Sequence, residues 1–215
     1  MTRILIATRN PHKVAEIRQI LAGDFSFLSL ADFPAAPGVA EDATTFAGNA
    51  RKKAEGLAAW LAAHPPAPPA GAPRYVLADD SGLEVDALGG APGVYSARFA
   101  TDAADSPDAA NNAKLLRLLE RVPPESRTAR FCCVLALAAR EEPTRLFEGR
   151  CEGRIALCAA GAAGFGYDPL FIPRGCDRSF AELGDKVKNK ISHRACALAA
   201  LRRFLNSAAE GLAQT

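Results

Sequence analysis

The strongest constraint on the fold is an alternation along the chain between short apolar runs and segments with helical spacing. The run at 3–7, Arg-Ile-Leu-Ile-Ala, is continuous and β-branched, which is typical of a strand buried on both faces. Asn10-Pro11 follows, and these residues suit the N-cap and the first position of a helix. The chain is therefore predicted to begin with a strand, a polar loop and a helix.

The same alternation continues to the end of the chain. The pattern predicts a helix from Thr44 or Thr45 to about Ala63, a central strand at 75–78, a helix capped by Ser106-Pro107, paired strands at 131–139 and 144–149, and a last helix from near Ser192. Helices that interleave with buried runs and a hairpin predict an α/β protein with a mixed sheet. At 215 residues one domain is expected, with the proline-rich stretch 64–73 as a surface loop.

Composition narrows the class of protein. Half of the residues are apolar and 23% are charged, which excludes a disordered chain. A net charge of +2 gives no general attraction to nucleic acid. The six cysteines contain no C-x-x-C pair, and the first apolar run stops at Arg9, too short for a signal peptide or a membrane span. We expect a cytoplasmic protein with reduced thiols and with neither nucleic acid nor membrane as partner.

The loop 8–13, Thr-Arg-Asn-Pro-His-Lys, is the first polar cluster. It lies where the first helix begins, and the free N–H groups and positive dipole end of a helix N-terminus suit phosphate. The glycine and lysine spacing of a P-loop is absent. Two interpretations stay open, phosphate binding and ordinary helix capping.

A pair of adjacent acids follows the predicted central strand in Ala-Asp79-Asp80-Ser-Gly. Their carboxylates repel each other unless a cation or hydrogen bonds hold them. Mg²⁺ prefers oxygen ligands and commonly takes one or two carboxylates plus substrate phosphates, and the Glu41-Asp42 pair is another source of carboxylates. We favour a magnesium site over an ordinary Asp-Ser-Gly turn. Lys53, at the edge of an apolar helix stripe, either meets an anion or extends into water.

The last two clusters are Gly164–Pro169 and the basic run 186–194. In the first, glycines allow close approach of the backbone, and Phe165 and Tyr167 offer flat faces for a base; a loop with core aromatics is the alternative. The basic run is either a solvated face or a grip on phosphates or a carbonyl. Phosphate donors, paired carboxylates and an aromatic shelf together suit a nucleotide polyphosphate.

With these motifs in this order, the chain resembles the non-standard purine nucleoside triphosphate pyrophosphatases, the inosine triphosphatase family. The matching segments cover essentially the whole chain: Thr8–Lys13, Glu41, Thr45-Phe46, Asn49-Ala50, Lys53, Ala78–Leu83, Gly89–Arg98, Gly164–Pro169 and Ile191–Arg194. The resemblance implies an elongated, two-lobed α/β fold whose long mixed sheet bends around a central nucleotide cleft. It also implies Mg²⁺, a homodimer, and hydrolysis of ITP, dITP and XTP to the monophosphate and pyrophosphate, which cleanses the nucleotide pool.

The resemblance also implies a role for each matching residue. Asp80 would be the general base and a magnesium ligand, with Glu41 also at the metal and Asp79 assisting catalysis. The residues implied for substrate binding are Thr8, Arg9, Asn10, Pro11, His12, Lys13, Lys53 and Ser81 toward the phosphates and sugar, and Phe165, Gly166, Tyr167, Asp168, Lys188, His193 and Arg194 toward the base. Two features depart from the family pattern: Arg9 replaces a small residue, and the proline-rich loop is long.

Selectivity has to act at the purine 6-position, where inosine and xanthosine carry a carbonyl and adenosine an amino group. A donor such as Arg194 pairs with the carbonyl but faces a second donor in adenine, and an unpaired buried polar group costs roughly 1–3 kcal/mol. One rival is a pyrophosphatase for other damaged nucleotides, including pyrimidines. The other is a nucleic-acid module on the basic run 186–194, which Glu41, Asp79 and Asp80 disfavour because they repel a phosphate backbone.

Overall fold

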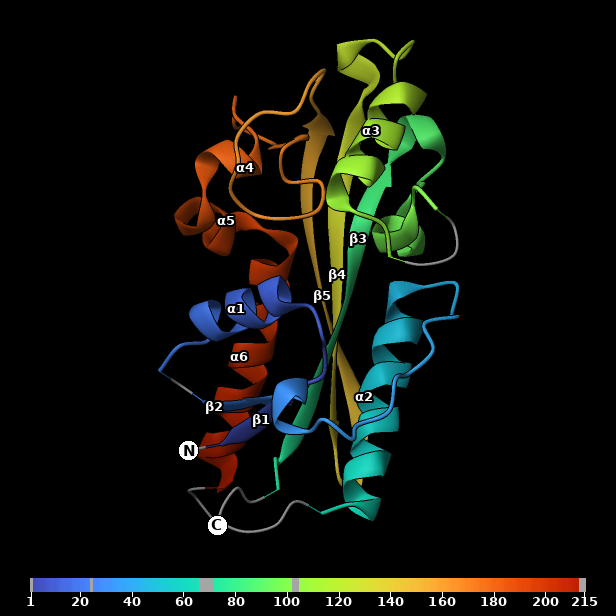
Figure 1. The fold of residues 1–215 in the computed structure, drawn as a ribbon. Helices are drawn as coiled ribbons and strands as arrows, with labels where there is room; N and C mark the ends of the chain where they lie inside the picture. Colours follow the sequence, from blue (N-terminus) through green and yellow to red (C-terminus); the bar gives the residue numbers. More distant parts are fainter. Residues whose placement is uncertain (1, 24, 66–71, 102–104, 213–215) are drawn as a thin grey trace. The chain divides into compact units, whose positions relative to one another are not determined.

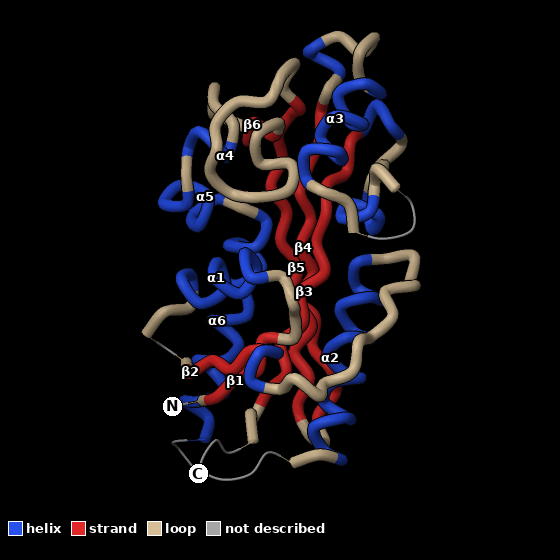
Figure 2. The backbone as a smooth tube through the Cα atoms, viewed as in Figure 1, coloured by secondary structure: helices blue, strands red, loops and turns tan. Residues whose placement is uncertain are grey.

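A six-stranded sheet in the order β2-β1-β3-β4-β5-β6 forms the frame of the computed structural model (Figures 1 and 2). β1 (Arg3–Ile6) pairs in parallel with β2 (Ser26–Ser29) and with β3 (Tyr75–Val85). β4 (Thr128–Ala139) follows β3 in the sheet, and β5 (Glu142–Ile155) pairs antiparallel with β6 (Phe171–Pro173). The sheet is therefore mixed, which confirms the predicted α/β class.

The structure describes residues 2–23, 25–65, 72–101 and 105–212, so most of the proline-rich stretch 64–73 lies outside the described residues. The chain divides into two units: unit 1 contains residues 1–80, 134–148 and 197–215, and unit 2 contains 81–133 and 149–196. The chain first passes from unit 1 to unit 2 at the peptide bond between Asp80 and Ser81. A single domain stays a prediction. Among the described residues, no helix has the length and apolarity needed to cross a membrane.

Unit 1 begins with the predicted strand, loop and helix. The side chain of Asn10 accepts hydrogen bonds from the backbone N–H groups of His12 and Lys13 at 2.9 and 3.2 Å, and α1 (Pro11–Ile20) starts at the next residue. Thr45 caps α2 (Phe46–Ala63) in the same way, through the N–H of Gly48. Both helix starts agree with the sequence because capping depends on residues close together in the chain.

Unit 2 is organised around a core of aromatic and aliphatic side chains from its strands and helices. The rings of Phe131 and Phe171 lie 4.6 Å apart, and Phe180 stacks on Phe171 at 5.5 Å. The helices that surround this core are α3 (Asp108–Leu118), α4 (Phe180–Leu183) and α5 (Asp185–Ile191), and α6 (His193–Leu212) begins in this unit. The last helix starts close to the predicted Ser192.

The central strand is longer than its sequence predicts. The expected strand at 75–78 continues to Val85, so Asp79, Asp80 and Ser81 lie inside β3. The interpretation of these residues as an ordinary turn is therefore wrong. Turn propensity is a local preference, and here it yields to pairing and to charge neutralisation by distant side chains.

Two further elements differ from the sequence prediction. Ser106 does not cap α3 with its side chain; Pro107 is the N-cap residue, and the helix ends at Leu118, so the apolar residues 119 and 122 lie beyond it. The lysine run 186–190 forms a short helix of its own, α5, which the sequence pattern does not predict.

A buried arginine binds three backbone carbonyl groups of unit 2. The guanidinium of Arg127 donates to the carbonyl groups of Leu119 at 2.7 Å, Val122 at 3.0 Å and Ala156 at 3.1 Å, and the residue is 4% exposed. Leu119 and Val122 follow the end of α3, and Ala156 follows β5. One side chain therefore satisfies the carbonyl groups at both of these chain turns.

We predict that Arg127→Met lowers the free energy of unfolding by about 2–4 kcal/mol, because the apolar stem survives while three buried carbonyls lose charged donors. Urea unfolding measures the change. The matched control is Arg117→Met on the exposed side of α3, where we expect a change below about 0.5 kcal/mol. Equal effects of the two substitutions would contradict a structural role for Arg127.

Candidate active site

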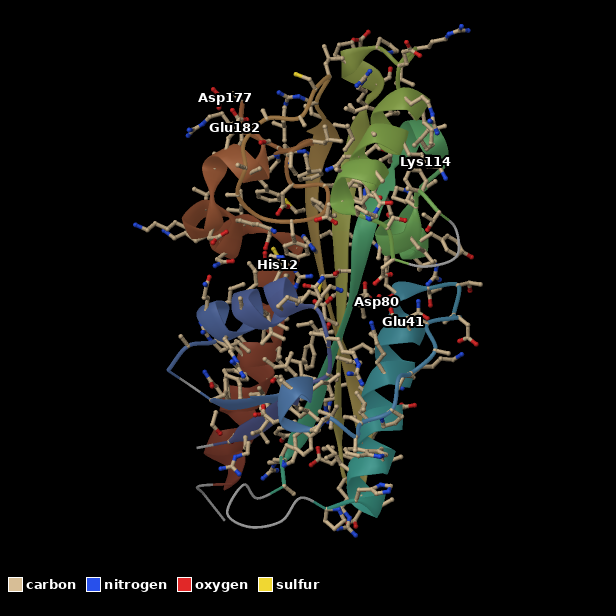
Figure 3. All side chains as sticks on the ribbon, viewed as in Figure 1. His12, Glu41, Asp80, Lys114, Asp177 and Glu182 are labelled. Atoms are coloured by element: carbon tan, nitrogen blue, oxygen red, sulfur yellow. The ribbon has the colours of Figure 1, made fainter. Side chains whose placement is uncertain are left out.

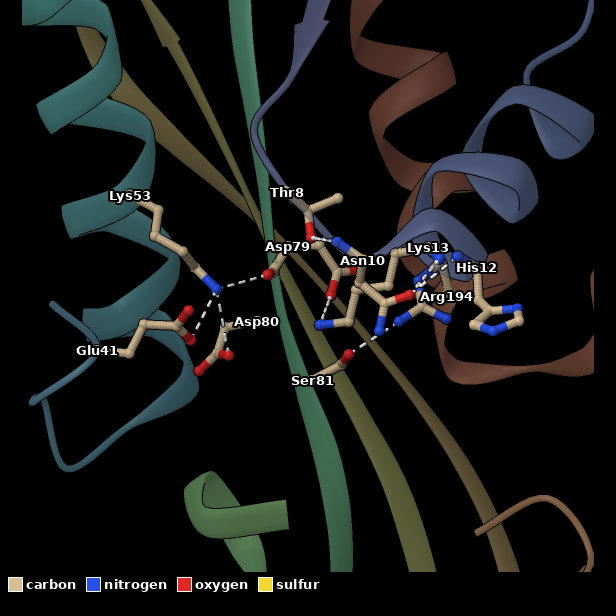
Figure 4. A network of polar contacts seen from close by, with 10 residues as sticks. All are labelled: Thr8, Asn10, His12, Lys13, Glu41, Lys53, Asp79, Asp80, Ser81 and Arg194. Atoms are coloured by element: carbon tan, nitrogen blue, oxygen red, sulfur yellow. Dashed lines mark hydrogen bonds and ion pairs between the residues drawn. The ribbon is translucent and has the colours of Figure 1, made fainter. Parts of the chain in front are cut away.

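Asp79 and Asp80 are consecutive residues of β3, so their side chains leave opposite faces of the strand. Both are buried, at 1% and 6% exposure. An oxygen of Asp79 lies 2.7 Å from Nζ of Lys13 on α1, and Oδ1 of Asp80 lies 3.4 Å from Nζ of Lys53 on α2 (Figure 4). Each carboxylate therefore has its own lysine, and this explains how an acidic pair can lie inside a strand.

Lys53 holds three groups of unit 1 together. Its ammonium group donates to Oε2 of Glu41 at 3.0 Å and to the backbone oxygen of Asp79 at 2.8 Å, besides its contact with Asp80. Of the two predicted alternatives, the anion is the one observed. Burial by itself lowers the pKa of Lys53, but the attraction of Asp80, Glu41 and Asp79 exceeds that effect, so the pKa is raised and the lysine stays charged.

The environment of Asp80 suits a proton acceptor. Burial raises its pKa from 3.8 to about 6; Lys53 and Lys13 act in the opposite direction, and the charge of Glu41 adds to the rise. Its second oxygen, Oδ2, is buried and has no hydrogen-bond partner among the described residues. A carboxylate that has a raised pKa and one oxygen without a hydrogen-bond partner fits the role of general base.

The carboxylates of Glu41 and Asp80, both labelled in Figure 3, are of the kind that binds a magnesium ion. Both approach the same ammonium group, and carboxylate oxygens are the ligands that Mg²⁺ prefers. In the described part of the chain, no three or more His, Cys, Asp or Glu side chains gather as a metal cluster. Two carboxylates suit an ion that completes its shell with phosphate oxygens and water, rather than a zinc site with its full protein ligand set.

The loop before α1 is ordered by its own side chains. Oγ1 of Thr8 accepts a hydrogen bond from the N–H of Asn10 at 3.2 Å, and Asn10 caps the helix. Arg9, the departure from the family pattern, donates to the carbonyl oxygen of Ala36 at 2.8 Å. The capping interpretation is confirmed for Asn10, while phosphate binding by this loop, including His12 beside it, stays a prediction.

In unit 2, the loop 164–169 is folded around the carboxylate of Asp168, which is 1% exposed. Oδ2 of Asp168 accepts from the N–H of Phe165 at 2.8 Å and from Nζ of Lys188 at 2.5 Å. Gly164 has a φ of +75°, and a Cβ there would lie 2.1 Å from the same oxygen. Only glycine fits that position.

Two cations lie against the ring of Phe165. Nζ of Lys188 is 4.4 Å from the ring centre, and Cζ of Arg194 is 5.8 Å from it. Arg194 is 1% exposed, and it donates to Oγ of Ser81 at 2.8 Å. The structure thus brings an aromatic face and a buried donor together, and cation–π attraction favours this contact.

The neighbouring aromatic residues are occupied within the protein. The hydroxyl group of Tyr167 donates to the carbonyl oxygen of Ser96 at 2.9 Å, and burial raises the pKa of this hydroxyl group. The ring of His193 stacks on Phe131 at 4.7 Å. Tyr167 fits the alternative of a core aromatic residue, and contact of either residue with a base stays a prediction.

The site residues expected from the sequence therefore form two groups. The acidic group, in unit 1, contains Glu41, Asp79 and Asp80 with Lys13 and Lys53. The aromatic group, in unit 2, contains Phe165, Asp168, Lys188 and Arg194 with Ser81. The two groups are joined covalently by the peptide bond between Asp80 and Ser81.

One residue that sequence reasoning left without a role belongs to the acidic group. Asn49 is 1% exposed, and its Oδ1 accepts from the N–H of Ala43 at 2.9 Å; its side chain also acts to lower the pKa of Asp80. Asn49 lies one turn after Phe46, on the apolar stripe of α2. A buried amide needs hydrogen-bond partners, so this position in the sequence could have indicated a polar role for Asn49.

We predict that Asp80→Asn stabilises the metal-free protein above pH 6. The folded-state pKa of about 6 exceeds the ordinary value of 3.8, so the contribution of Asp80 to stability is present at low pH and lost as the pH rises through about 6. A difference of one unit between the folded-state and unfolded-state pKa corresponds to about 1.4 kcal/mol in the free energy of unfolding. We therefore expect Asp80→Asn to raise the free energy of unfolding by roughly 1–3 kcal/mol at pH 8.

Urea unfolding in chelator at pH 4 to pH 8 measures this gain, which should shrink toward pH 4. Asp42→Asn is the matched control, because a hydrogen bond from Lys52 lowers the pKa of Asp42; this carboxylate therefore stays charged in the folded and unfolded states over most of this range, and the effect of its substitution should be nearly independent of pH. An Asp80→Asn gain that is absent at pH 8, or equal at pH 4 and pH 8, would contradict the prediction.

Three known proteins are similar to this chain over nearly its full length. The chain is 50% identical over 202 residues to a dITP/XTP pyrophosphatase of Geobacillus kaustophilus, covering 94% of this chain and 93% of the relative. It is 46% identical over 205 residues to a dITP/XTP pyrophosphatase of Shouchella clausii, covering 95% and 97%. The structure of a HAM1 protein from Coxiella burnetii is similar with a TM-score of 0.81 and 37% identity, over 96% of this chain and 100% of that one.

The family assignment rests on a match over almost the full length. The model of the Ham1 family matches residues 4–204, a range that includes every residue of the acidic and aromatic groups. The resemblance seen in the sequence motifs is thereby confirmed: the chain belongs to the Ham1 family.

Proposed function

We propose that the protein is a magnesium-dependent nucleoside triphosphate pyrophosphatase that converts dITP, XTP and ITP to the monophosphate and pyrophosphate. The observation that carries this proposal is the buried carboxylate of Asp80, with its raised pKa and an unoccupied oxygen, beside Glu41 and Lys53. The relatives named dITP/XTP pyrophosphatases support the substrate class.

Hydrolysis between the α and β phosphates needs a water molecule in line with the leaving group, a base, and positive charge on pyrophosphate. Asp80 accepts a proton of the water through Oδ2 as the water oxygen bonds to phosphorus. The bond to the bridging oxygen then breaks, and its electron pair leaves with pyrophosphate. Lys13 and Lys53 carry the positive charge that this step requires. Mg²⁺, held by Glu41 and Asp80, would supply further charge on the phosphate oxygens.

Recognition of the base falls to the aromatic group. The ring of Phe165 offers a stacking face, and Asp168 fixes the backbone beside it through the N–H of Phe165. Arg194, buried and with a donor already oriented toward Ser81, suits the 6-carbonyl of hypoxanthine and xanthine. Adenine would present an amino donor there, which cannot accept a hydrogen bond from the arginine.

The wider setting follows from this activity. Removing inosine and xanthosine triphosphates prevents their incorporation into DNA and RNA, so we propose that the protein cleanses the nucleotide pool in the cytoplasm, as a homodimer. A pyrophosphatase for other damaged nucleotides, including pyrimidines, is the alternative that a substrate panel separates.

The experiment that tests the proposal is one assay of ITP, dITP, XTP, ATP, GTP and a pyrimidine triphosphate, with Mg²⁺, that resolves pyrophosphate from single phosphate. We expect pyrophosphate from the first three substrates, no activity in chelator, and recovery of activity with Mg²⁺.

Asp80→Asn should lose nearly all turnover while the protein stays folded by circular dichroism. Turnover of this variant within a few-fold of the wild type, or release of single phosphate, would refute the proposal.

Arg194→Ala tests selectivity, because it removes the donor assigned to the 6-carbonyl. The ratio of kcat/KM for ITP to that for ATP should fall by roughly tenfold or more, or about 1.4 kcal/mol of differential binding. Phe165→Ala is the companion variant: it removes stacking of roughly 1–3 kcal/mol and should weaken all purine substrates alike. An unchanged ratio in Arg194→Ala would show that the arginine does not recognise the base.

A further inference from the structure

Helix α3 holds the loop 164–169 by the peptide groups of one residue. The N–H of Gly166 donates to Oδ2 of Asp108 at 2.6 Å, and the carbonyl oxygen of Gly166 accepts from Nδ2 of Asn112 at 3.0 Å. Asp108 and Asn112 are four residues apart, so they lie on one face of the helix. Both polar groups of Gly166, the residue that follows Phe165, are thus bound by α3.

The helix that holds Gly166 is itself fixed on the segment that precedes it. Oδ1 of Asn111 accepts from the N–H of Ala100 at 2.7 Å, and Nζ of Lys114 (Figure 3) donates to the carbonyl oxygen of Phe99 at 2.5 Å. α3 is therefore anchored independently of the loop. It can act as a fixed support for Gly166 rather than move with it.

Gly166 lies in a turn that the loop closes with a hydrogen bond from the N–H of Asp168 to the carbonyl oxygen of Phe165 at 3.3 Å, and α3 adds two further restraints at Gly166 itself. Gly166 has a φ of +63°, a left-handed backbone conformation that glycine adopts most readily. Its freedom is limited by the two hydrogen bonds to Asp108 and Asn112. Oδ1 of Asn112 is buried without a hydrogen-bond partner among the described residues, which leaves Gly166 as the contact that orients this amide.

We propose that Asp108 and Asn112 are positioning residues for recognition of the base. By fixing the peptide groups of Gly166, they hold the ring of Phe165 in the orientation in which a purine stacks on it. The inference rests on the proposed function for its substrate, but the restraint on the loop is a property of the protein alone. Neither residue belongs to the segments that match the family pattern.

Four substitutions separate the two hydrogen bonds from other effects. Asp108→Ala and Asn112→Ala each remove one bond. Asp108→Asn keeps an oxygen acceptor without the charge and should restore the wild-type behaviour. Asn112→Asp keeps the size of the side chain but places a carboxylate against the carbonyl oxygen of Gly166, so it removes the donor of this hydrogen bond. Asn206→Ala, at an exposed position of α6, is the matched control for exchanging asparagine with alanine in a helix.

Steady-state kinetics with dITP and with a triphosphate that lacks a base, such as ribose triphosphate, give the first measurement. We expect KM for dITP to rise three- to tenfold in the two alanine variants, and more in Asn112→Asp, with kcat within about twofold. The base-free substrate should show the same KM in all variants, because its phosphates depend on the acidic group. An equal rise for both substrates would overturn the positioning role.

Hydrogen exchange by mass spectrometry gives the second measurement and needs no activity. Amides of the peptide that contains 163–168 should exchange several-fold faster in Asp108→Ala and Asn112→Ala, and as in the wild type in Asp108→Asn and Asn206→Ala. Unchanged exchange in the alanine variants would refute the restraint itself. If the wild type hydrolyses no nucleotide while exchange changes as expected, the proposed function fails and the restraint stands.

Discussion

Burial of two adjacent carboxylates in β3 is the constraint on which the rest of unit 1 depends. Asp79 and Asp80 leave opposite faces of the strand, so one helix cannot neutralise both. α1 supplies Lys13 to one carboxylate and α2 supplies Lys53 to the other. The helices of this unit are therefore placed by charge as well as by apolar packing, and a strand that would otherwise be broken by repulsion continues through the pair.

The same arrangement leaves Asp80 incompletely stabilised. Lys53 divides its donors among Glu41, Asp80 and the backbone of Asp79, and burial still raises the pKa of Asp80. A carboxylate satisfied on both oxygens would be a weaker base and a poorer ligand. The site thus keeps one carboxylate oxygen of Asp80 available to water or to a cation, at the expense of stability, as is common where function requires a destabilised group.

Local features of the sequence predicted the helix starts but not the extent of β3. Asn10 and Thr45 act on N–H groups two or three residues away, so their roles follow from the sequence alone. The partners of Lys53 lie 12 to 27 residues away, and only the fold decides between an anion and water. The contacts of Gly166 with Asp108 and Asn112 span more than 50 residues. The residue pattern within one helix or one loop does not predict hydrogen bonds between residues so far apart in the sequence.

The covalent order of β3 connects the two groups of residues. Arg194 hydrogen-bonds to Ser81, and Ser81 follows Asp80 directly in the strand. Consecutive Cα atoms across a trans peptide are about 3.8 Å apart, so the residue that receives the bond from Arg194 has a fixed Cα separation from Asp80, the proposed base of the reaction. Under the proposed function, the partner of the arginine assigned to the 6-carbonyl and the carboxylate assigned to proton transfer are therefore adjacent residues of one strand. This link is a property of the covalent chain, since one peptide bond joins Asp80 to Ser81.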